Sequence, residues 1–333
     1  MTIFKNKKMK MLTAGIMLTL AMGMMVGCGG EKKEVAKKEK VNVGIVQLVE
    51  HAALDAANKG FVDGLAAKGF KEGQNITFDR QNAQADQSNL QNIAQRFVSN
   101  KVDLICAIAT PAAQTVANVT PDIPIVGTAI TDYKAAKLIK DNAKPGTNVT
   151  GTTDMNPVEA QLDLALQLVP GAKAVGTIYS SSEVNSQLQV DILKKAAAVK
   201  KVEIVEATVT TVNDIQQAAR SLVGKVDVIY IPTDNVLASA MPTLAMVTEE
   251  AKIPVVCGEG EAVKSGGIAT LGIDYYKLGV QTGEMAADIL SGKAKPQDMP
   301  IQAQKDFDVI VNFESAKKIG LTIPKEILDK AKK

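Results

Sequence analysis

The sequence is poor in the residues on which many catalytic and metal sites depend. Its 333 residues include one His, three Cys and no Trp, with five Tyr and seven Phe. A single His, His51, leaves no cluster of metal ligands. The chain also lacks a Gly-x-Ser-x-Gly nucleophile elbow, a P-loop, and a Gly-x-Gly-x-x-Gly turn after its first predicted strand. We therefore expect a protein that is not an enzyme, with no catalytic residue, no metal and no cofactor.

An excess of positive charge is also absent. The 38 Lys and Arg and the 36 Asp and Glu give a net charge of +2. Residues 1–27 hold four Lys and no acidic residue, so their removal leaves about −2. A basic surface for nucleic acid is therefore not expected. Because sugar receptors commonly stack rings on Trp, its absence favours a ligand held by hydrogen bonds and charge.

The N-terminus has the pattern of a lipoprotein signal peptide. A basic segment comes first, with Lys5, Lys7, Lys8 and Lys10. Met11–Gly27 is then uncharged and mostly apolar, and its length of about 17 residues is below the roughly 20 that span a membrane. The segment ends at Met25-Val26-Gly27-Cys28, which resembles a bacterial lipobox, although Met25 stands where Leu is usual. The alternatives are a plain secretion signal or a single membrane anchor with an incidental Cys.

The segment after the signal is expected to tether a folded body to the membrane. Residues 28–40 are dense in Lys and Glu and have little to bury, which is typical of a flexible chain. Lipid chains such as palmitate on Cys28 would anchor this tether at the outer face of the bacterial cytoplasmic membrane. The body, residues 41–333, has the length of two ordinary domains.

Apolar runs typical of buried strands alternate with segments of helical periodicity along the body. The predicted strands are 41–49, 76–81, 102–109, 123–127, 174–179, 202–207, 226–231, 254–257, 267–272 and 307–312. The predicted helices are 52–68, 87–99, 111–119, 157–169, 183–199, 212–222, 235–251, 275–290 and 314–319. Such alternation predicts an α/β fold with parallel sheets and helices on both faces. Cys106 and Cys257 fall inside strands and are expected to be small buried side chains.

An internal similarity divides the body into two equivalent lobes. The run 101–105, Lys-Val-Asp-Leu-Ile, matches 225–229, Lys-Val-Asp-Val-Ile, and the preceding helices match at the same offset. Downstream, Ile-Pro-Ile-Val at 123–126 resembles Ile-Pro-Val-Val at 253–256. Lys-Val-Asp before an apolar strand is also common in other α/β proteins. We predict two Rossmann-like lobes, with lobe one formed by 41–150 plus 272–333 and lobe two by 151–271, joined by crossovers near 148–152 and 271–273.

Polar residues follow the predicted strands, where open parallel sheets bind their ligands. Helices begin at these points, and their free N–H groups favour anionic ligand groups. The candidate ligand residues are Glu50, His51, Thr110, Pro111, Ala112, Thr128, Ser181, Ser182, Asn185, Thr233, Asp234, Asn235 and Asp274. The alternative for many of them is helix capping, which by itself explains Ser, Thr and Asp at such places.

Several motifs give the body a resemblance to a known family. Gly-Ile-Val-Gln at 44–47, Ala-Thr-Pro-Ala-Ala-Gln at 109–114, Pro-Gly-Thr-Asn-Val-Thr-Gly at 145–151, Pro-Thr-Asp-Asn at 232–235 and Asp-Tyr-Tyr at 274–276 carry it. They resemble the tryptophan/tyrosine-type substrate-binding proteins of ABC transporters. The resemblance implies a type I periplasmic-binding-protein architecture with the ligand cleft between two lobes. It also implies delivery to an ABC permease with its ATPase subunits, and it implies that most of the candidate residues, Thr110 to Asp274, line the cleft.

A small molecule, an aromatic amino acid in the first place, is therefore the expected ligand. We hypothesise that its carboxylate lies at the helix start after Thr110 or Ser182, and that Asp234, Asp274 or Glu50 pairs with its ammonium. The turn around Glu259 departs from relatives, which more often show a small polar stretch there. The alternatives are another amino acid, a sugar, a nucleoside, or a lipoprotein that presents its ligand to a membrane sensor.

Overall fold

The computed structural model describes residues 40–332, which lie in one compact unit spanning residues 39–333. The predictions of a signal peptide over 1–27, of lipidation at Cys28 and of a tether over 28–40 lie outside the described residues, except for Lys40 at the end of the tether. Within 40–332, no helix combines the length and the apolar character that a membrane span requires.

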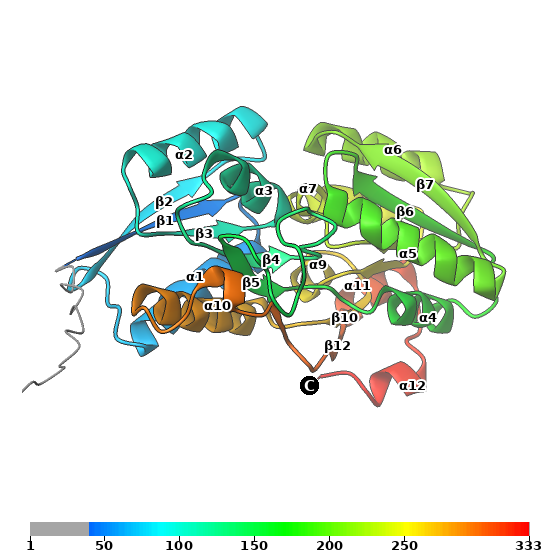
Figure 1. The fold of residues 1–333 in the computed structure, drawn as a ribbon. Helices are drawn as coiled ribbons and strands as arrows, with labels where there is room; N and C mark the ends of the chain where they lie inside the picture. Colours follow the sequence, from blue (N-terminus) through cyan, green and yellow to red (C-terminus); the bar gives the residue numbers. More distant parts are fainter. Residues whose placement is uncertain (1–39, 333) are drawn as a thin grey trace, which may run out of the picture. The chain divides into compact units, whose positions relative to one another are not determined.

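The first sheet has six parallel strands in the order β11-β5-β4-β3-β1-β2 (Figure 1). Its strands are β1 (Val41–Gln47), β2 (Ile76–Asn82), β3 (Leu104–Ile108), β4 (Ile125–Ile130), β5 (Val149–Thr153) and β11 (Gln302–Ala303). Its helices are α1 (Ala52–Ala67), α2 (Gln87–Ser99), α3 (Thr110–Val119) and α10 (Tyr275–Leu290). The α1 and α10 helices cover one face and α2 and α3 the other, so β3 and β4 are fully buried.

The second sheet has the order β12-β10-β9-β8-β6-β7, and only β12 runs antiparallel. Its strands are β6 (Ala174–Ser180), β7 (Glu203–Val209), β8 (Val228–Ile231), β9 (Val255–Cys257), β10 (Ala269–Gly272) and β12 (Asp308–Val311). The accompanying helices are α4 (Val158–Leu168), α5 (Val184–Lys200), α6 (Ile215–Leu222), α7 (Asn235–Ser239), α8 (Met241–Glu250), α9 (Gly260–Lys264), α11 (Phe313–Ile319) and α12 (Lys325–Leu328). Two α/β lobes of mostly parallel strands confirm the predicted fold class.

The repeated sequence segments occupy equivalent places in the two sheets. The first Lys-Val-Asp run leads into β3 and the second into β8. Each of these strands lies between the first strand of its lobe and the strand that directly follows an Ile-Pro pair. The helices that match, α2 and α6, precede these strands. The internal similarity therefore reflects two lobes of the same topology. Cys106 and Cys257 lie buried and unbonded on β3 and β9, as predicted.

The chain passes between the sheets three times. The crossovers are the segments between β5 and α4, between β10 and α10, and between β11 and β12. The last one corrects the prediction that all of 272–333 belongs to lobe one, because β12 pairs with β10 and α11 packs on α8 in the second lobe. The strand β12 covers the edge of β10, whose backbone groups would otherwise lack partners in the sheet. The β5 strand, which we had predicted as a crossover, adds a fifth strand to the first sheet.

A predicted helix over 235–251 is divided in two. The break falls at Ala240, whose ψ of 29° departs from helical geometry, and α8 begins with Pro242 in its first turn. Proline has no N–H to donate to the preceding turn, and its ring clashes with the carbonyl four residues earlier. The short helix α7 therefore ends at Ser239. It begins at Asn235, close to the end of β8.

Helices α1 and α10 pack closely through glycines. A Cβ on Gly60 would lie 2.1 Å from the Tyr276 carbonyl oxygen, and a Cβ on Gly279 would lie 2.0 Å from the Ala57 carbonyl oxygen. The backbones can approach this closely only because neither position has a side chain. The close packing holds the first turns of both helices at the same end of the lobe, where His51 and Tyr275 lie.

Candidate functional site

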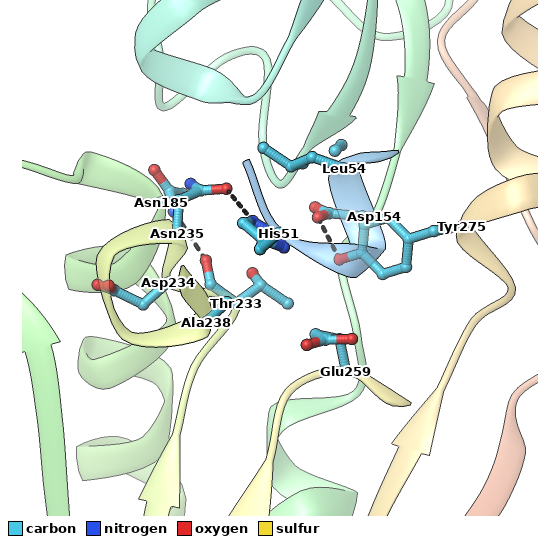
Figure 2. Close-up of a pocket in the computed structure, with 11 residues that line it drawn as sticks. His51, Leu54, Asp154, Asn185, Thr233, Asp234, Asn235, Ala238, Glu259 and Tyr275 are labelled. Atoms are coloured by element: carbon cyan, nitrogen blue, oxygen red, sulfur yellow. Dashed lines mark hydrogen bonds between the residues drawn. The ribbon is translucent and has the colours of Figure 1, made fainter. Parts of the chain in front are cut away.

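An enclosed cavity lies between the carboxyl ends of the strands of the two lobes (Figure 2). The first lobe contributes His51, Leu54 and Ala129. The second lobe contributes Asn185, Thr233, Asp234, Asn235, Ala238 and Glu259. Asp154 comes from the crossover between β5 and α4, and Tyr275 is the first residue of α10, directly after the next crossover. Its volume of about 10 Å³ holds one water molecule, so a larger molecule can enter only if the lobes separate.

The structure brings together part of the predicted set. His51, Asn185, Thr233, Asp234 and Asn235 line the cavity. Five of the others do not line it. Glu50, Ser181 and Ser182 are exposed, whereas Thr128 and Asp274 accept hydrogen bonds from other residues of the protein. Asp274 caps α10 by accepting a hydrogen bond from the Lys277 N–H, so for this residue helix capping replaces the predicted ligand contact.

Thr110, Pro111 and Ala112 form the first turn of α3. They follow β3, whose neighbours in the sheet are β4 and β1, so this turn lies between Ala129 and His51 at the same sheet edge. The Thr110 hydroxyl is buried and has no hydrogen-bond partner within residues 40–332. The first turn of α3 does not line the cavity. Beside the cavity, however, it has the Thr110 hydroxyl and the N–H groups of a helix start, which could donate hydrogen bonds to a ligand.

The prediction missed Leu54, Ala129, Asp154, Ala238 and Tyr275, and it noted Glu259 only as an unusual turn. Glu259 follows the end of β9, and Ala129 is the penultimate residue of β4, which extends three residues beyond the predicted end of that strand at residue 127. Asp154 follows β5, so recognising 149–153 as a strand would have pointed to it. Leu54 and Ala238 lie one turn inside helices and have no sequence signal of their own.

Asp154 links the crossover to both lobes. Its carboxylate accepts hydrogen bonds from the Tyr275 hydroxyl at 2.7 Å and the Thr131 hydroxyl at 3.0 Å. The Thr131 hydroxyl lies in turn 3.2 Å from the Thr233 hydroxyl of the second lobe. Burial raises the pKa of Asp154, and the two hydroxyl donors only partly oppose this. The carboxylate retains unused acceptor positions and lacks a cationic partner among the described residues that line the cavity.

Glu259 caps the short helix α9. Its side chain accepts the Ala262 N–H at 2.6 Å and the Glu261 N–H at 2.5 Å, and only 5% of the residue is exposed. Burial raises the pKa of Glu259 to about 7, while the two N–H donors and Lys264 lower it. The Glu261 carboxylate, two residues further along the chain, adds to the rise.

The raised pKa of Glu259 makes stability depend on pH. The pKa of this carboxyl is higher in the folded state than its ordinary value of 4.5, so the folded protein binds the proton more tightly. Its contribution to stability is therefore complete below pH 4.5 and is lost as pH rises through about 7. We expect the free energy of unfolding to fall over this range by up to about 3 kcal/mol from this group. Urea unfolding at several pH values would measure the slope. The E259Q variant should show a shallower slope, and an identical slope would contradict the assignment.

Asp234, in contrast, is fully engaged with the protein. It caps α7 by accepting the Leu237 N–H at 2.9 Å, and it accepts the Ser180 N–H at 2.6 Å and the Ser186 hydroxyl at 2.7 Å. Burial raises its pKa, and these donors lower it. The Asp234 carboxylate thus accepts three hydrogen bonds from the protein. It has fewer acceptor positions left for a ligand than Asp154 or Glu259, which accept two each.

His51 connects the lobes from the start of α1. Its Nε2 lies 3.3 Å from the Asn235 Oδ1 (Figure 2). Burial lowers the pKa of His51, while the bond to Asn235 and the nearby Asp55 carboxylate raise it. The net lowering favours the neutral imidazole at pH 7. Among residues 40–332, three carboxylates and no Lys or Arg line the cavity. The same part of the chain contains no cluster of three or more His, Cys, Asp or Glu that could hold a metal ion.

The comparisons with known proteins agree with this geometry. Residues 42–333 match the family model described as ABC transporter substrate binding protein. A tyrosine-binding protein of Clostridioides difficile is 44% identical over 328 residues, covering 96% of this chain and 94% of that protein. A domain from Streptococcus pneumonia, solved in complex with L-Trp, is 39% identical with a TM-score of 0.84, covering 88% of this chain and 98% of its own.

A third relative shows the effect of lobe arrangement. It is the ligand-free, open structure of a substrate binding protein with adhesive properties from Clostridium difficile, 48% identical, covering 87% of this chain and 98% of its own. Its TM-score of 0.67 is lower than that of the L-Trp complex, although its sequence is more similar. The lobes here are therefore arranged more like those of the complex than those of the open protein. With the family model spanning nearly all of the described residues, the chain belongs to the ABC transporter substrate binding protein family.

Proposed function

We propose that the chain is the extracytoplasmic receptor of an ABC importer and binds an aromatic amino acid when its two lobes close. The observation that carries the proposal is the enclosed cavity between the lobes, lined by Asp154, Asp234 and Glu259 but by no Lys or Arg of the described residues. A cationic group on the ligand would stabilise the charged form of these buried carboxylates. Relatives that are named for tyrosine or were solved with L-Trp support an aromatic amino acid.

The ammonium group of the ligand would pair with Asp154 and Glu259. Both carboxylates are buried at the cavity and keep unused lone pairs. The hypothesis made from the sequence named Asp234, Asp274 or Glu50 instead. Of these, Asp274 and Glu50 do not line the cavity, and Asp234 is engaged by three protein donors.

The carboxylate of the ligand would lie at the first turn of α3. The buried Thr110 hydroxyl without a partner and the free N–H groups of that turn support this position, and the helix dipole favours an anion there. The alternative after Ser182 is less suitable because Ser181 and Ser182 are exposed. The apolar part of the ligand would contact Leu54, Ala129 and Ala238, beside the Tyr275 ring.

The setting of the receptor belongs to the same proposal. Lipidation of Cys28 would hold it at the outer face of the cytoplasmic membrane, where it delivers the ligand to its permease. A binding role rather than catalysis is supported by the state of the two buried Cys residues, since burial raises the pKa of Cys106 and Cys257 and keeps both thiols protonated.

A thermal-shift screen of the chain from residue 29 onward tests the ligand class. The twenty amino acids would be compared with sugars and nucleosides. A ligand at 100 times its Kd should add about 2.7 kcal/mol to the free energy of unfolding. We expect Trp, Tyr or Phe to raise Tm. A rise with a sugar or nucleoside alone would overturn the amino acid assignment and leave the receptor role.

A further inference from the structure

Glu183 lies behind the cavity and holds two of the side chains that line it. It is only 2% exposed and occupies the position before α5. Its carboxylate accepts the Asn185 Nδ2 at 2.9 Å, the Asn235 Nδ2 at 2.5 Å and the Asn235 backbone N–H at 3.0 Å. Every one of these bonds has the carboxylate as acceptor. Burial and the neighbouring Asp234 raise the pKa of Glu183, and the N–H donors lower it.

These bonds determine how the two side-chain amides are oriented, and at Asn185 a bond from Nδ2 to the Thr233 carbonyl oxygen at 2.9 Å supports the same orientation. An amide has its NH2 group on one side and its oxygen on the other. Because both NH2 groups point to Glu183, both oxygens point away from it. The Asn235 oxygen then faces His51 (Figure 2). The Asn185 oxygen, in a residue 4% exposed that lines the cavity, accepts no hydrogen bond within residues 40–332.

The orientation of Asn235 decides the tautomer of His51. An amide oxygen can only accept, so the His51 Nε2 must carry the hydrogen in their 3.3 Å contact. A neutral ring with a proton on Nε2 leaves Nδ1 as an acceptor.

We propose that Glu183 is a positioning residue that orients both amides, so that the Nε2–H tautomer of His51 closes onto Asn235 while the Asn185 oxygen is presented to an N–H group of the ligand. Glu183 itself does not line the cavity. It acts through Asn185 and Asn235, and it supports the hydrogen bond between His51 and Asn235, which is one of those that join the lobes.

The single His of the chain allows a direct test. Nitrogen NMR of the full chain, labelled with 15N-histidine and purified without a polyhistidine tag, reports one imidazole ring. We expect the wild type to show the neutral Nε2–H tautomer. In E183Q the new NH2 group opposes the two Asn NH2 groups, so Asn235 should rotate and the ring should change to the Nδ1–H tautomer. The control D191N makes the same chemical change at an exposed position on α5 and should match the wild type.

The wild-type spectrum is decisive even if E183Q fails to fold. A wild-type ring in the Nδ1–H form, or one exchanging freely between tautomers, would overturn the proposal. An E183Q protein that folds and keeps the Nε2–H tautomer would overturn it as well.

The part that concerns the ligand rests on the proposed function. Loss of a correctly oriented acceptor should weaken binding of the amino acid to E183Q by about tenfold. The des-amino analogue should bind E183Q and the wild type alike. An equal loss for both compounds would contradict the role of the Asn185 oxygen. If the wild type binds no amino acid, the proposed function fails, while the tautomer still decides the role of Glu183.

Discussion

Replacing Asp154 by Asn is expected to weaken binding of the amino acid about 100-fold while the fold keeps its stability. Removing one partner of a buried, hydrogen-bonded charge pair typically costs about 2–5 kcal/mol of binding free energy. The Thr131 and Tyr275 hydroxyls can bond to an amide as well as to a carboxylate, so the local structure should persist. Because burial raises the pKa of Asp154, a neutral side chain without a ligand should leave the free energy of unfolding unchanged or higher.

Calorimetry of ligand binding and urea unfolding of the same variant would separate these two effects. A matched control is E159Q, which removes a carboxylate from an exposed position on the following helix. We expect D154N, but not E159Q, to lose its discrimination between the amino acid and the des-amino analogue. If D154N binds the amino acid as tightly as the wild type, the ammonium group does not pair with Asp154.

Replacing Gly279 by Ala is expected to lower the free energy of unfolding by about 3 kcal/mol or more. The added Cβ would lie 2.0 Å from the Ala57 carbonyl oxygen, which is backbone and cannot move aside as a flexible side chain could. Overpacking of a well-packed contact costs about 1–3 kcal/mol and occasionally more. The α1 and α10 helices would have to separate, which shifts His51 and Tyr275 at their first turns. Affinity for the ligand should therefore fall as well.

Urea unfolding measures this change. The control K277A removes an exposed side chain from the same helix and should alter stability by no more than about 0.5 kcal/mol. A G279A protein as stable as the wild type would show that the two helices can separate without cost, contrary to the close packing described here.

Patterns that are local in the chain predicted most of the fold. Alternating apolar runs and helical periodicity lie within segments of 4 to 17 residues, and the structure has a strand or helix at each of them. The repeated Lys-Val-Asp run indicated two equivalent lobes because the same local sequence builds the same strand at the same place in each sheet. Pro242, which divides the helix predicted over 235–251, was a local signal that could have been used.

Long-range pairing could not be predicted in the same way. Whether β12 joins the first or the second sheet depends on which edge is open when the chain returns, and the sequence of 308–311 suits either edge. The crossover that carries Asp154 was predicted a few residues too early, near 148–152, for the same reason, since β5 has a short, Thr-rich sequence that becomes a strand by pairing with β4.

The sequence alone determined that polar side chains follow the strands, which places a ligand site at the strand ends of an α/β protein. Only the tertiary structure decided which of them remain available to a ligand. Asp234 and Asp154 are both buried acids after a strand, but Asp234 accepts three bonds from its own lobe, whereas Asp154 accepts two hydroxyl bonds beside the cavity. That distinction depends on partners 48 to 121 residues away in the chain, such as Ser186 and Tyr275, which come together only when the lobes have folded.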